Sequence, residues 1–177
     1  ALLHDIGKPQ TRTTDADGTD HFHGHVEVSE RMAAAILKRL KFDNDTITKV
    51  QKYVKYHDYN AEPSAKAVRR AINKIGAEYF PQILELRRAD TLAQSAYQQA
   101  EKLERIDAIA RLYDEIMEQQ QCVSLKTLEI TGNDLIALGV PKGKRIGAIL
   151  AELLDDVLQN PENNTHDYLM EEAKKLI

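Results

Sequence analysis

The first ten residues, ALLHDIGKPQ, place His4 beside Asp5, directly ahead of Gly7 and Lys8. An imidazole next to a carboxylate can bind a divalent cation or take part in proton transfer. Neighbouring residues on a helix point about 100° apart, so these two side chains converge on one ion only near a helix end. The apolar residues before the pair predict a buried helix that Gly7 ends, with Lys8 projecting from the following turn.

Two ligands are too few for a metal centre, and three further candidates follow along the chain. His25 begins an amphipathic segment in FHGHVEVSE, and His57 ends another in VKYHDY. Asp90 lies in LRRADTLAQ, where its apolar neighbours predict a buried helical face. Because an isolated buried charge is costly, Asp90 needs a cationic partner, which is either a metal ion or one of the adjacent arginines, Arg87 and Arg88.

A mixed set of imidazole and carboxylate ligands favours an octahedral divalent ion such as Mn²⁺, Mg²⁺, Fe²⁺, Co²⁺ or Ni²⁺. A structural zinc site would prefer thiolates. A plainer interpretation also fits, in which His25 and His57 are ordinary, partly buried histidines. Asp58 is predicted to be a solvated helix end, and His21 and His23 are predicted to be loop residues.

The composition bounds the class of protein. A chain of 177 residues, 42% of them hydrophobic and 29% charged, is long enough for one domain, or for one domain with a small appendage. The net charge of −4 argues against a wholly basic nucleic-acid-coating protein, although it permits a local basic site. Cys122 is the only cysteine, so we expect no internal disulfide and a reducing, cytoplasmic setting.

The lengths of the apolar runs bear on membrane attachment, and the first residues bear on whether the chain is a fragment. No apolar run is long enough to span a bilayer, so no membrane partner is expected. The sequence starts inside an apolar run, without an initiating Met or a polar N-cap residue. We therefore expect a fragment of a longer protein.

The elements that must position these residues are helices. Apolar periodicity predicts helices over residues 26–40 and 45–56, one that stops at Gly76, and two more over residues 78–96 and 97–121. Residues 9–21 are polar and rich in turn formers, and they predict a loop. No segment alternates apolar and polar residues for long, so the fold class is predicted to be all-α. A change of composition after QQQ predicts a helical metal-binding domain over residues 1–121 and a small helical tail domain over residues 122–177.

The tail carries a candidate phosphate site. Residues 132–134 are predicted to start a short helix, and LGVPKGKRIG is predicted to form a tight turn that leads into an amphipathic helix. Gly143, Lys144 and Arg145 would then lie at the N-terminus of this helix, just after Lys142. Free backbone N–H groups and basic side chains at such a position suit a phosphate group. A plain turn between helices with solvated charges fits the spacing at least as well.

The order and spacing of the first set of residues resembles the HD-domain superfamily of metal-dependent phosphohydrolases. That family is helical, and His4 and Asp5 match its name-giving pair. The resemblance implies that His25, His57 and Asp90 are further metal ligands and that Lys8 contacts phosphate. Asp5 would then belong to the catalytic centre together with Lys8. The family's first histidine lies upstream of the pair, where this sequence has no residue, so metal binding and hydrolysis are expected to be weakened.

The tail is similar to that of bacterial CCA tRNA nucleotidyltransferases of the poly(A) polymerase type. The likeness is carried by ITGNDLIALGVPKGKRIGAILAELLDDVLQNPENNTHDYL, and FHGHVEVSERMAAAILKRLKF looks like the HD segment of the same proteins. The resemblance implies a tRNA-contacting tail, with Lys142, Lys144 and Arg145 as RNA-binding residues. The Gly-Ser element and Asp-x-Asp pair of the polymerase head are not in this sequence. The segment DADGTD follows no such element and is interpreted as turn chemistry.

The most economical interpretation is the HD and tRNA-binding portion of a CCA-adding type nucleotidyltransferase, with no polymerase activity of its own. The HD site would hold a nucleotide or another phosphoester, and the family implies phosphomonoesters or 2′,3′-cyclic phosphates at RNA ends as substrates. One alternative is a stand-alone HD phosphohydrolase that acts on nucleotides or RNA ends. Another is a degenerate HD module that only acts as a scaffold.

Overall fold

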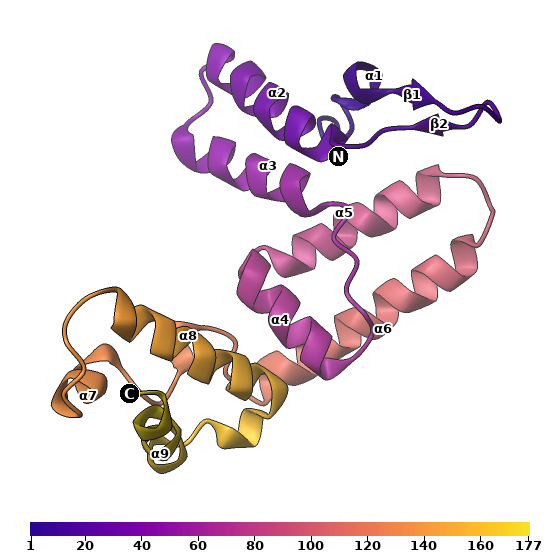
Figure 1. Ribbon diagram of the computed structural model, residues 1–177. Helices are drawn as coiled ribbons and strands as arrows, with labels where there is room; N and C mark the ends of the chain where they lie inside the picture. Colours follow the sequence, from indigo (N-terminus) through magenta and orange to yellow (C-terminus); the bar gives the residue numbers. More distant parts are fainter. The chain divides into compact units, whose positions relative to one another are not determined.

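The computed structural model describes residues 1–177, and it is all-α apart from one short hairpin (Figure 1). The strands β1 (Thr13–Thr14) and β2 (Asp20–His21) pair antiparallel, and Thr13 lies opposite His21. None of the helices combines the length and hydropathy that a membrane span requires. The α-helices are α1 (Lys8–Thr11), α2 (His25–Arg39), α3 (Asn44–Tyr56), α4 (Ala65–Ile75), α5 (Phe80–Ala93), α6 (Gln99–Glu118), α7 (Gly132–Ala137), α8 (Lys144–Gln159) and α9 (His166–Leu176), and two 3₁₀ turns span Leu125–Thr127 and Pro161–Asn163.

The chain divides into two compact units, each made of two segments. Unit 1 comprises Ala1–Ala61 and Ile75–Ala110, and unit 2 comprises Glu62–Lys74 and Arg111–Ile177. These structural units differ from the two domains, residues 1–121 and 122–177, that the sequence predicts. The boundary between residues 121 and 122 separates two expected roles and stays a prediction.

In unit 1, α2 and α3 lie side by side and run antiparallel (Figure 1). Their contact buries Ala33 and Leu37 of α2 and Val54 of α3. The carboxylate of Asp43 caps α3 by accepting a hydrogen bond of 2.9 Å from the backbone N–H of Thr46. This antiparallel pairing brings the start of α2 and the end of α3 to the same place.

The buried helix predicted at the start of the chain is wrong. Residues 2–7 form consecutive turns, Leu2 is 94% exposed, and the first helix begins only at Lys8, beside Pro9. Proline suits the first turn of a helix because its φ is already fixed near the helical value.

Gly7 is required for a different reason from the one expected, since its φ of −83° is open to any residue. A Cβ at this position would lie 2.7 Å from the backbone nitrogen of Ser29 and 2.8 Å from the carbonyl oxygen of His25. Gly7 therefore permits a close approach to α2.

The predicted loop over residues 9–21 contains α1 as far as Thr11 and the β1–β2 hairpin. Two-residue strands are too short to show an alternating pattern, so the sequence could not reveal them. The turn chemistry predicted for DADGTD is present. The Asp15 carboxylate accepts hydrogen bonds from the N–H groups of Asp17 and Thr19, at 3.0 and 2.9 Å, and Gly18 takes a positive φ of 79°.

Unit 2 has its own apolar core around one face of α8. Leu135 of α7 and Leu169 of α9 pack against it, and Cys122 is a free, buried thiol in the same core. The start of α8 follows the prediction, since Gly143 is its N-cap, and Thr165 is the N-cap of α9. The residues that α8 contributes to this core are Ile149, Leu153, Leu154, Val157 and Leu158.

Candidate functional site

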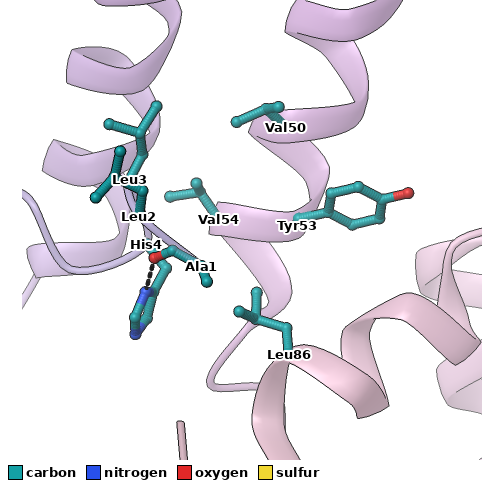
Figure 2. A pocket seen from close by; sticks show the side chains of 8 residues that line it. All are labelled: Ala1, Leu2, Leu3, His4, Val50, Tyr53, Val54 and Leu86. Carbon is teal, nitrogen blue, oxygen red and sulfur yellow. Dashed lines mark hydrogen bonds between the residues drawn. The ribbon is translucent and has the colours of Figure 1, made fainter. Parts of the chain in front are cut away.

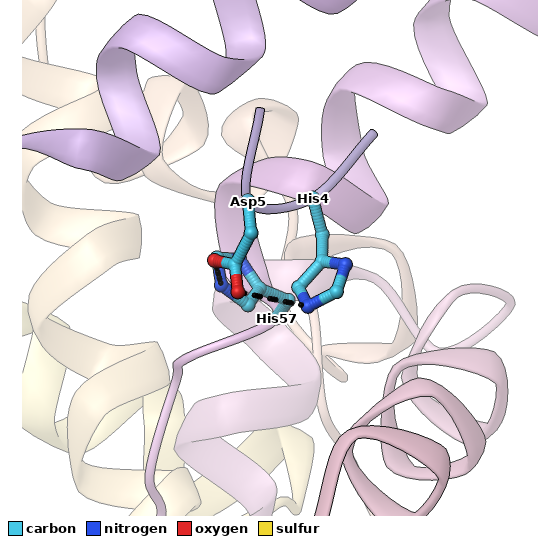
Figure 3. Close-up of side chains that lie close together, drawn as sticks. All are labelled: His4, Asp5 and His57. Atoms are coloured by element: carbon cyan, nitrogen blue, oxygen red, sulfur yellow. Dashed lines mark ion pairs between the residues drawn. The ribbon is translucent and has the colours of Figure 1, made fainter. Parts of the chain in front are cut away.

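The Asp5 carboxylate lies at the centre of three histidines in unit 1. Its Oδ2 is 3.3 Å from Nε2 of His4, and its Oδ1 is 3.4 Å from Nε2 of His25 and 3.5 Å from Nε2 of His57. Figure 3 shows the side chains of His4 and His57 close to this carboxylate, with an ion pair drawn to each. Four of the five residues predicted as metal ligands therefore meet at one point.

Three elements bring these side chains together. The backbone N–H of Gly7 donates to the Ser29 hydroxyl at 2.9 Å and ties the turn that carries Asp5 to the first turns of α2. His25 is the first residue of α2, and His57 caps the end of α3. Because α2 and α3 are antiparallel neighbours, their histidine-bearing ends face the same turn.

Hydrogen bonds to the backbone orient all three imidazoles. Nδ1 of His25 bonds the carbonyl oxygen of Phe22 at 2.9 Å, and Nδ1 of His57 bonds that of Val54 at 2.7 Å. Nδ1 of His4 bonds the carbonyl oxygen of Ala1. A carbonyl can only accept, so each Nδ1 carries a proton and each ring turns Nε2 toward Asp5.

Asp90 joins the group through His4. Its Oδ1 is 3.2 Å from Nε2 of His4, and its Oδ2 accepts a hydrogen bond of 2.6 Å from Gln94. Neither adjacent arginine is its partner, because Arg88 pairs with Asp107 and Arg87 donates to Asn60 at 3.1 Å. The face expected to be buried around Asp90 is only partly so, since the nearby Leu92 is exposed.

Asp58 is the residue that sequence reasoning missed. Its side chain is 58% exposed, as expected of a helix end, yet it turns toward the cluster. Its Oδ2 is 3.3 Å from Nε2 of His25, and its Oδ1 is 3.4 Å from Nε2 of His57. The available signal was the dipeptide His57-Asp58, which repeats His4-Asp5.

The residues of this cluster fit a divalent cation. Oδ1 of Asp5 and Nε2 of His25 are buried and have no hydrogen-bond partner, although such atoms are nearly always paired in folded proteins. Two groups, His4–Asp5–His57 and His25–His57–Asp58, each hold their ligand atoms within 4.8 Å of one another. Neutral imidazoles and carboxylates are the ligands that octahedral divalent ions accept.

Lys8 lies beside the cluster, where the family resemblance places a phosphate-contacting cation. Its Nζ donates to Oδ2 of Asp5 at 2.5 Å. Burial acts to raise the pKa of Asp5, but the hydrogen bond from Lys8 and the charges of His4, Lys8 and His57 outweigh it, so the pKa is lowered. Asp5 is therefore held as a carboxylate.

A second basic residue stands near Asp58. Burial lowers the pKa of Arg87, and the nearby charge of Arg105 lowers it further, while the charge of Asp58 acts in the opposite direction. Arg87 is therefore a partly desolvated cation at the edge of the cluster.

An apolar pocket opens next to His4 (Figure 2). One wall is formed by Ala1, Leu2, Leu3 and His4, and the other by Val50, Tyr53 and Val54 of α3 with Leu86 of α5. The hollow offers apolar surface on one side of a polar cluster.

The basic residues predicted in the tail lie at the N-terminus of α8, and all three are exposed. Gly143 has a φ of 141°, which favours glycine at this N-cap. Arg145 donates to the carbonyl oxygen of Leu176, whereas no carboxylate pairs with Lys142 or Lys144. The positions match the expectation, and the RNA-binding role stays a prediction.

With the helical fold and the histidine–aspartate cluster described, the chain can be compared with known proteins. The family model for tRNA nucleotidyltransferase domain 2 matches residues 20–173. The chain therefore belongs to the tRNA nucleotidyltransferase family. No solved structure gives a significant match.

Two curated relatives are similar over most of the chain. A CC-adding tRNA nucleotidyltransferase of Thermus thermophilus is 31% identical over 157 residues, which are 88% of this chain and 34% of the relative. An A-adding tRNA nucleotidyltransferase of Deinococcus radiodurans is 30% identical over 158 residues, which are 87% of this chain and 36% of the relative. The chain thus spans about a third of the length of either relative.

Proposed function

We propose that the chain is the HD and tRNA-binding portion of a CCA-adding type tRNA nucleotidyltransferase, and that its histidine–aspartate cluster is a metal-dependent phosphohydrolase site. The observation that carries the hydrolase part is the convergence of buried, unpartnered ligand atoms at Asp5. The family match over residues 20–173 supports the tRNA part, with the cytoplasm as its expected location.

In the proposed metal centre, His4, Asp5, His25, His57 and Asp90 hold the ion. A bound divalent ion supplies Lewis-acid chemistry and makes hydroxide available near neutral pH. The backbone carbonyls behind the three histidines hold Nδ1 as the donor and keep Nε2 aimed inward. Lys8, which pairs with Asp5, would supply a cation for a phosphoryl oxygen at this site.

The hydrolase proposal is tested with phosphomonoesters and RNA 2′,3′-cyclic phosphates as substrates. We expect Mn²⁺-dependent hydrolysis that falls by about 100-fold or more in His4→Ala and Asp5→Ala, because each substitution removes a ligand. The control His166→Ala removes an exposed histidine of unit 2 and should leave the rate unchanged. Equal activity in all four proteins would refute the assignment.

In unit 2, the proposed tRNA contact is the N-terminus of α8 with Lys142, Lys144 and Arg145. No carboxylate pairs with Lys142 or Lys144. In α9, by contrast, Lys174 pairs with Glu171 and Lys175 pairs with Glu172, each at 2.5 Å. Exposed lysines without a carboxylate partner leave their ammonium donors available for phosphate contact.

The tRNA proposal is tested by measuring tRNA affinity against salt concentration. Replacing Lys142 and Lys144 by Gln should weaken binding and reduce the slope of log K against log salt by about 1–2. The double substitution of Lys174 and Lys175 by Gln is the matched control, and its effect should be small. Binding that depends on α9 rather than on the start of α8 would contradict the proposal.

A further inference from the structure

We propose that Asp58, which is not part of the HD pattern, is a metal ligand that binds one cation together with His25 and His57. The inference rests on the proposed metal centre and extends it by one residue. Asp58 follows directly after α3 and presents one carboxylate oxygen to each of the two imidazoles, at 3.3 Å from Nε2 of His25 and 3.4 Å from Nε2 of His57.

The hydrogen bonds and burial of the two rings bear on what these contacts mean. Nδ1 of each histidine donates to a backbone carbonyl, at 2.9 Å for His25 and 2.7 Å for His57, so Nε2 of a neutral ring carries a lone pair. The lone pair of such a nitrogen and a carboxylate oxygen repel each other unless a cation lies between them. His57 has only 3% of its side chain exposed and Nε2 of His25 is buried, so bulk water has little access to either ring.

A direct ion pair between protonated histidines and Asp58 describes the geometry less well. Charge-assisted N–H···O bonds are about 2.7–2.9 Å long, whereas the four distances from Nε2 of His25 and His57 to Asp5 and Asp58 are 3.3–3.5 Å. Neighbouring ligand atoms at about 2.0–2.2 Å from one ion lie about 3.3–3.6 Å apart in a tetrahedral site and about 2.8–3.1 Å apart in an octahedral one. The observed spacing is therefore close to that of ligands around one ion and wider than that of a charge-assisted hydrogen bond.

The rival role for Asp58 is to balance the charge of Arg87. Arg87 is close enough to be affected by that charge, but no ion pair joins the two side chains, and Arg87 donates instead to Asn60 at 3.1 Å. The carboxylate is thus directed at the histidines, and the guanidinium contacts the loop that follows. The two roles predict different consequences when Arg87 is changed.

The test measures Mn²⁺ binding to the full chain by titration calorimetry, with elemental analysis after dialysis. We expect Asp58→Asn to weaken Mn²⁺ binding by about tenfold or more, because it keeps the shape and removes the charged ligand. Arg87→Gln should leave the affinity within about threefold of wild type by the same measure. Asp167→Asn, in the exposed pair His166-Asp167, is the matched control and should also bind like wild type.

A second variant gives a positive signal. Asp58→Cys places a thiolate at the same position, and we expect a thiolate-to-metal charge-transfer band when Co²⁺ is added, which wild type lacks because its only thiol, Cys122, is buried in unit 2. Wild-type binding with unchanged affinity in Asp58→Asn, or no band in Asp58→Cys, would overturn the role of Asp58 alone. No Mn²⁺ binding by wild type would overturn both this role and the metal centre on which it rests.

Discussion

Each unit buries strongly polar groups, and the two units treat them differently. In unit 2, the Arg69 side chain is only 5% exposed and donates to the carbonyl oxygens of Leu158 and Gln159 and to the Gln121 side chain, at 2.9–3.0 Å. In unit 1, Oδ1 of Asp5 and Nε2 of His25 are buried without any hydrogen-bond partner. A buried polar group whose partners belong to the chain stabilises the fold, whereas one without partners is a candidate ligand for a bound ion.

The dipeptide His-Asp makes the same point at smaller scale. His57-Asp58 and His166-Asp167 are the same two residues in sequence, but His57 is buried in the cluster while both His166 and Asp167 are exposed at the start of α9. In the second pair, the closest approach of the ring to Asp167 is 3.9 Å, and no further ligand converges on them apart from Asp134 at 3.8 Å. The surroundings rather than the dipeptide make a candidate site.

The largest effect is expected where the site is built against α2. In Gly7→Ala, the new Cβ would lie 2.7–2.9 Å from the Ser29 nitrogen, the Ser29 hydroxyl and the His25 carbonyl oxygen, so the turn carrying Asp5 must move. We expect a loss of about 3 kcal/mol in the free energy of unfolding, measured by urea denaturation, together with loss of metal binding.

Gly147→Ala is the control for this prediction. Gly147 lies inside α8, and a Cβ there would meet nothing within 4 Å. Alanine should stabilise the helix by about 0.5–1 kcal/mol. The two glycine substitutions therefore have opposite signs, and a neutral Gly7→Ala would show that the close approach to α2 is not needed.

The next effect concerns the satisfied polar group in unit 2. Arg69→Met keeps the apolar stem but leaves the last carbonyls of α8 without their donor, so we expect a loss of about 2 kcal/mol, measured by the same denaturation. Arg70→Met is the matched control. Arg70 is half-exposed, and it pairs at 2.7 Å with Asp155, which lies on α8 like the carbonyl groups that Arg69 contacts. An exposed pair contributes about 0–1 kcal/mol. Equal losses in both variants would remove the contrast between the two units.

Much of this fold could be predicted because helices leave a periodic signal. The apolar period predicts α2, α3 and α8, and the turn before Lys144 predicts the start of α8, where Gly143 is the N-cap. The turn over residues 2–7 was mistaken for a helix, because three apolar residues in a row are consistent with either a buried helix or an exposed turn.

The site was predicted from residue types, and its geometry required the structure. His4, Asp5, His25, His57 and Asp90 could be chosen by order and spacing, but periodicity says nothing about which helix ends meet. Asp58 was set aside because a charged residue at a helix end is usually solvated. Only the antiparallel packing of α2 and α3 turns it toward two imidazoles.

The smallest effect is expected at a surface carboxylate of unit 2 whose partners are all supplied by the chain. Oδ2 of Asp134 accepts hydrogen bonds from both the hydroxyl and the backbone N–H of Thr131, each at 2.7 Å, and these bonds lower the pKa of Asp134, with a further contribution from His166. Because the pKa is lower in the folded state, Asp134 stabilises unit 2 above its unfolded pKa near 3.8. That contribution is lost as the pH falls through the lower, folded value.

Asp134→Asn should therefore lower the thermal unfolding temperature slightly at pH 7, and the difference from wild type should vanish as the pH falls well below 4. Asn133→Ala, an exposed neutral neighbour on α7, is the control and should give a difference that does not change with pH. A gap between Asp134→Asn and wild type that persists at low pH would show that the carboxylate acts through packing rather than through its charge. The hydrogen bonds from Thr131 to Asp134 would then not stabilise unit 2 through the charge of the carboxylate. The contrast between this carboxylate, which has partners in the chain, and the unpartnered Oδ1 of Asp5 would no longer rest on charge.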